Sequence, residues 1–270
     1  MNSIRTLVQR HPLAAFFILA YALSWWLAPI AGGLFPFGPL LAAILVEYLT
    51  RGKTGLKTWW CRVTRWRGRW YWYALAIVLP FAVNFAAAAL AVLFGAAFPP
   101  PEQIARWPEL FITFPLYLIL FGPLGEEPGW RGFAMPRLQE NRPPLVATLL
   151  LGLFIAIWHL PLVLSGQQFA IILLAVFAVQ IMYTWLANRV EGRVLIVLLA
   201  HAAQGGLGGE YFSSMFSGAD ARLETWMLVA VTCLVSLAIV LATGARLGEK
   251  DPAYTASLTA IEPVPLSEAR

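Results

Sequence analysis

Two adjacent glutamates and an arginine form the first group of residues that could do chemistry. Glu126 and Glu127 stand side by side in an apolar stretch, and Arg131 follows Glu127 by four residues. On a helix, neighbours point about 100° apart whereas residues four apart share a face, so Arg131 is expected to pair with Glu127. That pairing leaves the Glu126 carboxylate free for another partner. Pro128 and Gly129 are expected to loosen the backbone and open it to water.

Two histidines in later apolar stretches form the second group. His159 lies in GLFIAIWHLPL and His201 in VLLAHAAQGG. Ionisable side chains in a bilayer are costly and usually serve a function. Two histidines and a carboxylate from three helices can form an acid–base site or hold a metal ion. The alternative is that each histidine only hydrogen-bonds between helices and that the Glu–Arg pair is a structural clamp. Because both carboxylates and histidines occur among these few buried residues, an acid–base or metal site is favoured over a purely structural role.

The composition indicates that these residues lie in a membrane protein. Of 270 residues, 60% are hydrophobic and 12% are charged, whereas soluble domains carry about 25% charged residues. So few charges cannot cover a water-exposed surface, and disorder requires low hydrophobicity with high net charge. A helix that spans a bilayer needs about 20 mostly apolar residues. The sequence offers eight candidate spans, at 13–33, 36–49, 71–97, 109–125, 145–164, 169–187, 194–209 and 224–243.

The distribution of basic residues orients these spans. With eight spans, all of the 19 Lys and Arg residues except Arg106 and Arg222 fall on the side of the two termini. Since cytoplasmic loops are enriched in Lys and Arg, both termini are expected to be cytoplasmic. We therefore predict an all-α, multi-pass protein integral to the cell membrane. Its organisation is expected to be a cytoplasmic N-terminal tail (1–12), a single intramembrane domain (13–243) and a disordered cytoplasmic C-terminal tail (244–270).

A basic segment rich in tryptophan follows the second span. Residues 51–69 hold seven Lys and Arg residues, interleaved with Trp59, Trp60 and Trp66. Such a pattern can bind single-stranded nucleic acid, but beside membrane spans it is more typical of an interfacial segment. We expect it to contact anionic lipids and expect no nucleic acid partner. Glu47, one turn from the cytoplasmic end of its span, is expected to reach the headgroups.

Three motifs together resemble a known family. The string GEEPGWRGFAMPRLQ, with Glu126, Glu127 and Arg131, resembles the EExxxR motif of the CPBP family, the CAAX-protease and bacteriocin-processing (Abi) intramembrane proteins. The strings WHLPL around His159 and LLAHAA around His201 resemble its second and third motifs. The resemblance extends from about residue 35 to 205. It implies a bundle of about eight transmembrane helices around a polar cavity that faces the cytoplasm.

The resemblance also implies an activity and its residues. Family members that are enzymes are glutamate-dependent endopeptidases. By carry-over, Glu126 activates the attacking water with the help of His159, Glu127 and Arg131 hold the helix and its charge balance, and His201 stabilises the oxyanion. The substrate is expected to be a peptide or a membrane protein. The motif leaves open whether a divalent metal such as zinc is bound, with His159 and His201 as ligands, or no metal at all.

The sequence departs from the family pattern at the third motif. The family usually has Asn or Asp four residues after the histidine, and this chain has Gly205. Gln204 is adjacent but points about 100° away on a helix. This departure keeps a second reading open, in which the protein is a membrane scaffold or an immunity or sorting factor that binds a peptide without cleaving it. A secondary transporter is disfavoured, because no inverted repeat is visible.

Overall fold

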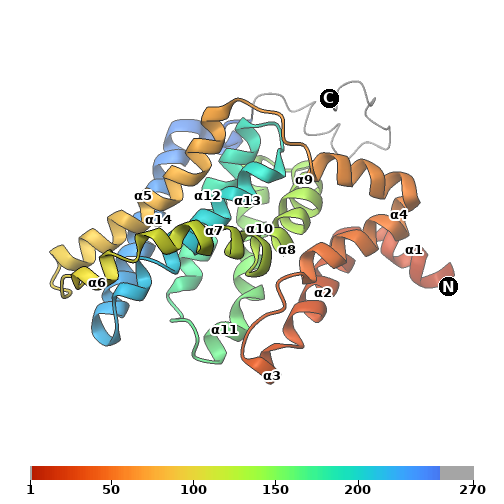
Figure 1. Cartoon of the computed structure of the whole chain (residues 1–270). Coiled ribbons are helices and arrows are strands. Elements are labelled where there is room, and N and C mark those ends of the chain that lie inside the picture. The colour runs from red at the N-terminus through yellow and green to blue at the C-terminus, as the bar shows by residue number, and fades with distance from the viewer. Residues whose placement is uncertain (1, 250–270) are drawn as a thin grey trace.

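A computed structural model describes residues 2–249, and within them the chain forms helices and no β-strand (Figure 1). The α-helices are α1 (Asn2–Arg10), α2 (Pro12–Trp25), α3 (Ala28–Ala31), α4 (Gly38–Val63), α5 (Trp70–Leu93), α6 (Pro101–Ile104), α7 (Leu110–Leu120), α8 (Pro123–Gly129), α9 (Met135–Gln139), α10 (Pro144–Trp158), α11 (Leu160–Leu164), α12 (Ile172–Arg189), α13 (Val194–Ala202) and α14 (Gly218–Thr243). Two π-helices, Trp130–Ala134 and Ala203–Gly209, continue α8 and α13. Short 3₁₀ turns occupy Trp107–Glu109, Ser213–Met215 and Gly244–Arg246.

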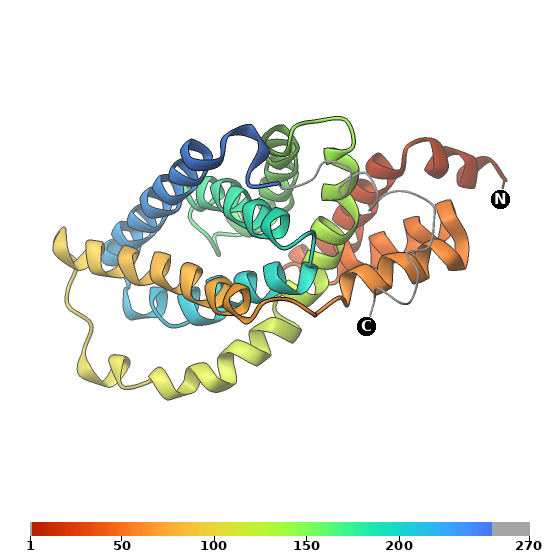
Figure 2. The ribbon, with the colours of Figure 1, turned by 90° about the horizontal axis from the view of Figure 1, so that it is seen from above.

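The helices are arranged so that the motif-bearing segments lie in the middle. Figures 1 and 2 show α5 and α14 on one side of the molecule and α2 and α4 on the other. Between them lie α8, α10 and α13. Helix α8 carries Glu126, α10 ends at Trp158 directly before His159, and α13 carries His201. α7 packs on α8 and on α13 and its π-helix. The two groups of candidate residues, distant in sequence, are therefore brought to the same part of the bundle.

The membrane character predicted from the sequence is confirmed, but the count of eight spans is not. By length and composition, five helical segments of residues 2–249 can cross a membrane, and a pair bent by 44° makes a sixth. The predicted spans 36–49 and 194–209 are helical but do not qualify. The first continues into a basic helix, and the second has nine α-helical residues before its π-helix. The qualifying segments are Pro12–Ala31, Trp70–Leu93, Pro144–Leu164, Ile172–Arg189 and Gly218–Arg246, with the bent pair Pro101–Leu120 and Pro123–Gln139.

A break at Gly122 separates α7 from α8 and sets the position of the first motif. Gly122 has φ +145°, a conformation that side chains other than glycine rarely adopt. A Cβ at this position would also lie 2.5 Å from Oε1 of Glu126. Pro123 then starts α8, where a missing N–H is tolerated. The break lets a new helix begin three residues before Glu126 and brings the glutamates into the protein interior.

Aromatic packing holds the first π-helix in place. The ring of Phe16 on α2 stacks on Phe133 at 4.9 Å between centroids and meets Trp130 edge-on at 5.4 Å. Trp130 in turn meets Trp158, at the end of α10, at 6.0 Å. All four side chains are at most 2% exposed. Offset and edge-to-face ring pairs add to the stabilisation from burial, so α2, α8 and α10 are fixed relative to one another.

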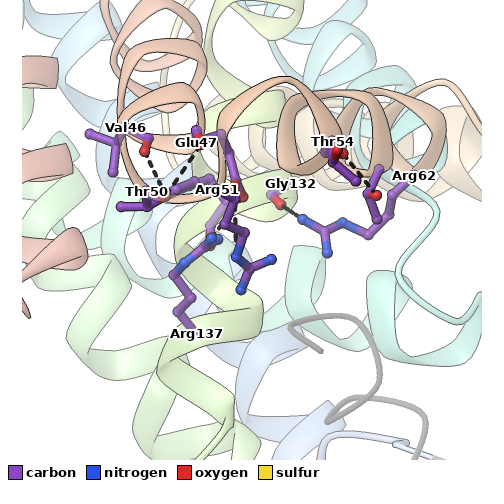
Figure 3. A network of polar contacts seen from close by, with 10 residues as sticks. Val46, Glu47, Thr50, Arg51, Thr54, Arg62, Gly132 and Arg137 are labelled. Carbon is purple, nitrogen blue, oxygen red and sulfur yellow. Dashed lines mark hydrogen bonds and ion pairs between the residues drawn. The ribbon is translucent and has the colours of Figure 1, made fainter. Parts of the chain in front are cut away.

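Glu47 does not reach the headgroups, and that expectation is wrong. Its side chain is fully buried and accepts a 2.7 Å hydrogen bond from Nη2 of Arg137 (Figure 3). Arg137 also donates to the carbonyl of Phe133 at 3.0 Å and covers its ring. Nε of Arg51 lies 3.9 Å from the other carboxylate oxygen of Glu47. Because the π-helix Trp130–Ala134, which leads into α9, packs against α4, the carboxylate is paired with a cation inside the protein rather than with lipid headgroups.

A kink divides α4 into an apolar half and a basic half. Gly52 has φ +67° and ψ −157°, which is not helical. Beyond it, Arg62 donates a hydrogen bond to the carbonyl of Gly132, next to Arg131 (Figure 3). Gly132 packs against Val63 and Trp59, so the basic half of α4 touches the first motif directly.

The two predicted tails are described in part. Residues 2–10 of the N-terminal tail form α1, whose Arg5 donates to the carbonyl of Leu49 at 3.2 Å. Residues 244–249 of the C-terminal tail begin with the 3₁₀ turn Gly244–Arg246 and include Leu247, which is fully buried. The disorder expected for the rest of that tail concerns residues 250–270, which lie outside the described residues.

Candidate active site

Glu127, Arg131 and His201 form a buried network of charged side chains. Nη1 of Arg131 lies 3.1 Å from Oε2 of Glu127, which is the pairing expected from their spacing. Nδ1 of His201 lies 2.8 Å from Oε1 of the same carboxylate. Glu127 and Arg131 are 1% and 4% exposed. A buried carboxylate requires such compensation, because an unpaired charge in the interior is strongly unfavourable.

Two side chains of α12 complete this network, and the sequence analysis missed both. Nη2 of Arg131 donates to Oε1 of Gln180, whose amide nitrogen donates to the carbonyl of Val176 at 2.8 Å. The ring of Tyr183 lies 5.2 Å from the guanidinium of Arg131 and 5.8 Å from the ring of His201. Gln180 is a polar residue in the middle of an apolar predicted span, and that signal could have revealed it.

Glu126 has a different environment from its neighbour. It is 5% exposed, and Nε1 of Trp130 lies 3.4 Å from its Oε2. In the described part of the chain no arginine or lysine forms an ion pair with it. The carboxylate turns toward the Gly122 break rather than toward Arg131. The 100° offset between helical neighbours thus gives the two glutamates separate partners.

The hydrogen bond that His159 makes determines its tautomer. Nδ1 of His159 lies 2.9 Å from the carbonyl oxygen of Ile155, one turn earlier on α10. A carbonyl only accepts, so Nδ1 carries the proton, and in the neutral ring Nε2 is left as an acceptor. The ring meets Trp158 edge-on at 4.9 Å. A histidine in this state can take a proton from water.

His201, unlike His159, can donate a hydrogen bond from Nε2. Nδ1 donates to Glu127 at 2.8 Å, so Nε2 donates only when the ring is an imidazolium. The adjacent carboxylate favours that charged form. His201 can therefore offer a charged hydrogen-bond donor, whereas His159 offers an acceptor.

The first and third motifs each run into a π-helix, a feature that the sequence did not predict. Trp130–Ala134 contains Arg131, and Ala203–Gly209 starts two residues after His201. Single π turns inside helices are frequent at functional sites, because the wider turn redirects side chains. The four small residues Gly205, Gly206, Gly208 and Gly209 in the second turn allow neighbouring helices to approach it.

The expected metal ligands do not form a complete donor set in this arrangement. Residues 2–249 contain no group of three or more His, Cys, Asp or Glu side chains placed to hold a metal ion. Nδ1 of both histidines is hydrogen-bonded, in His159 to Ile155 and in His201 to Glu127, which leaves Nε2 as the atom through which either ring would bind a metal. Catalytic zinc sites need three protein ligands. The described residues therefore do not form a complete metal site in this arrangement.

The fold and the site together define a class of protein. The chain is an all-α, multi-pass membrane protein with a carboxylate, two histidines and a Glu–Arg pair buried among its helices.

Comparison with known proteins finds similarity over the part of the chain that carries the candidate residues. Residues 105–206, which include all five candidate residues, match the family model described as type II CAAX prenyl endopeptidase Rce1-like. The chain is also 28% identical over 98 residues to CAAX prenyl protease 2 of Methanococcus maripaludis. That match covers 32% of this chain and 36% of the archaeal relative, so the chain aligns with about a third of that relative's length. The similarity over residues 105–206 agrees with the family resemblance that the three motifs predict.

Proposed function

We propose that this protein is an intramembrane endopeptidase that hydrolyses a peptide bond near the cytoplasmic membrane face. The observation that carries the proposal is the difference between the two glutamates. Glu127 is paired with Arg131 and His201, whereas the buried Glu126 carboxylate accepts a hydrogen bond from the indole N–H of Trp130, forms no ion pair among residues 2–249 and stays available as a base. The family match supports an activity of the same type.

The mechanism follows from the hydrogen-bonding capacities of these side chains. Glu126, assisted by Nε2 of His159, takes a proton from water as the water oxygen bonds to the substrate carbonyl carbon. The carbonyl oxygen becomes an oxyanion, and the imidazolium of His201 donates a hydrogen bond to it. When the C–N bond breaks, the proton held by Glu126 passes to the leaving amine. Glu127 and Arg131 position His201 and keep it charged.

The substrate class is proposed from the family. The matching family model is described as a CAAX prenyl endopeptidase, so we propose a peptide or a prenylated protein as substrate. A prenylated C-terminus brings its own membrane anchor, which would concentrate the scissile bond at the membrane surface.

We further propose that both termini are cytoplasmic and that the basic segment 51–69 contacts anionic lipids of the cell membrane. Lys53, Lys57 and Trp60 are exposed on the outer face of α4. Arg62 and Arg65 instead contact Gly132 and Glu191 of the protein, so the lipid-facing set is smaller than the sequence predicts.

The decisive experiment compares peptide termini in cells that carry the wild-type protein, Glu126→Gln or neither, at matched membrane levels. Glu126→Gln keeps the size of the side chain but removes the base. Glu224→Gln is the control, because Glu224 is also buried and its oxygen accepts from Ser213 at 3.0 Å, a bond that an amide can keep. New termini are expected with the wild type and with Glu224→Gln, and none with Glu126→Gln. Identical termini in all strains would refute the proposal.

A non-catalytic scaffold or sorting factor that binds a peptide is the second candidate. It is favoured by Gly205, which lacks the side chain expected at the third motif. Such a protein would produce the same phenotype with Glu126→Gln as with the wild type, while both would differ from the strain that lacks the protein.

A further inference from the structure

The space that a side chain at position 205 would occupy is filled by Tyr117. A Cβ built on Gly205 would lie 2.1 Å from Cζ, 2.2 Å from Cε1 and 2.3 Å from the hydroxyl oxygen of Tyr117. Gly206 packs against the base of the same ring, where a Cβ would lie 2.9 Å from the Cβ of Tyr117. The Gly205–Gly206 pair therefore forms a slot that this ring occupies. The Tyr117 hydroxyl of α7 lies where a side chain at position 205, the Asn or Asp of the third motif, would otherwise lie.

The position of the hydroxyl relates it to the candidate site. Gly205 lies one turn after His201, so the end of the Tyr117 ring reaches the face of α13 that carries His201. α7 also packs on α8, which carries Glu126. The phenol thus lies between the helix of the proposed base and the helix of the proposed oxyanion donor.

The hydroxyl has hydrogen-bonding capacity to spare. Among residues 2–249 no hydrogen bond joins it to another group, and the side chain is half-buried. The hydroxyl oxygen is not among the fully buried, unpartnered polar atoms of these residues, so it is accessible to a bound molecule. Packing alone would be satisfied by phenylalanine, whereas the hydroxyl adds a hydrogen-bond donor that a substrate can reach.

We propose that Tyr117 is a catalytic residue that donates a hydrogen bond to the oxyanion of the tetrahedral intermediate, replacing the side chain absent at Gly205. The inference rests on the proposed peptidase function. No proton is transferred: the phenol O–H donates as charge develops on the carbonyl oxygen, beside the donor of His201. With two donors, the site can stabilise the oxyanion despite its departure from the family pattern.

The first test removes only the hydroxyl. Purified wild-type protein, Tyr117→Phe and Glu126→Gln are placed in lipid nanodiscs with a quenched fluorescent peptide that ends in a farnesylated Cys-aliphatic-aliphatic-X sequence. Tyr117→Phe is expected to lower kcat about 10²-fold, the usual effect of losing one oxyanion donor, with KM unchanged. Tyr21→Phe is the control, since it removes a hydroxyl that donates to the carbonyl of Phe154 at 2.7 Å, away from the site. It is expected to retain wild-type kcat.

The second test exchanges the two positions. Gly205→Asn alone places a side chain against the Tyr117 ring and is expected to abolish cleavage. Tyr117→Leu removes the ring atoms that would clash and keeps packing against Gly206. Since no positive φ restricts Gly205, Asn fits its backbone. Tyr117→Leu/Gly205→Asn is expected to cleave at least about tenfold faster than either single variant.

The outcomes separate this inference from the function on which it rests. Cleavage by the wild type that is lost in Glu126→Gln and unchanged in Tyr117→Phe would overturn the role of Tyr117 and leave the peptidase intact. An equal loss of kcat in Tyr21→Phe would also overturn it, because the effect would then be one of packing. No cleavage by the wild type would overturn the proposed function and the role of Tyr117 together.

Discussion

Replacing Arg131 by methionine should expose how much the first motif depends on charge compensation. The substitution removes the contacts of Arg131 with both oxygens of Glu127, at 3.1 and 3.3 Å, and the hydrogen bond to Gln180. Glu127, 1% exposed, would keep His201 as its one remaining partner among residues 2–249. Removing one member of a buried pair typically costs about 3–5 kcal/mol, because the remaining charge stays uncompensated.

The size of the effect can be measured as a shift in the thermal unfolding midpoint in detergent. For a chain of this size, 1 kcal/mol corresponds to about 2–4 °C, so Arg131→Met is expected to lower Tm by at least about 6 °C. Adding Glu127→Gln removes the stranded charge and should restore a large part of the loss. Arg106→Met is the control, because the Arg106–Glu109 pair is more than half exposed on both sides and is worth under about 1 kcal/mol.

Two results would refute this reasoning. If Arg131→Met lowered Tm no more than Arg106→Met, the buried pair would contribute no more than a surface pair. If the double variant Arg131→Met/Glu127→Gln were less stable than Arg131→Met alone, the loss would come from packing against Tyr183 and not from the unpaired carboxylate.

Three further predictions follow from the structure. Arg137→Met should also lower Tm, since it leaves the fully buried Glu47 with the more distant Arg51, at 3.9 Å, as its ion-pair partner, and adding Glu47→Gln should recover part of the loss; an unchanged Tm would contradict the burial of that pair. Lys53→Gln and Lys57→Gln should each weaken the binding of phosphatidylserine by about 1 kcal/mol, as measured by native mass spectrometry, with phosphatidylcholine unaffected. Peptide cleavage should survive treatment with phenanthroline, because no complete set of metal ligands is present in residues 2–249; zinc at one equivalent per chain in the purified protein would contradict this.

The basic half of α4, which we propose to bind lipid, also contacts the first motif. Arg62 donates to the carbonyl of Gly132, and Arg137 ties the following turn to Glu47. Both contacts hold the π-helix that carries Arg131 against α4. The segment that the sequence marks only as lipid-binding therefore also supports the buried network.

Local spacing alone was enough to predict several features. Apolar stretches of bilayer length indicate a helical membrane protein, because every backbone group in lipid must be hydrogen-bonded within the chain. The i,i+4 relation of Glu127 and Arg131 predicts their ion pair, and the adjacency of Glu126 predicts that it faces elsewhere, since both follow from the helical repeat. The three motifs, taken together, predict the family.

Contacts between distant residues were decided only by the tertiary structure. Glu47 meets Arg137 across 90 residues and His201 meets Glu127 across 74, and no local periodicity encodes either pair. The same holds for the hydrogen bond between Arg131 and Gln180 and for Tyr117 in the Gly205 slot. There the ring of Tyr117, from α7, fills the space that a side chain at position 205 would occupy. Helix periodicity determines which residues share a face, but packing of whole helices determines which faces meet.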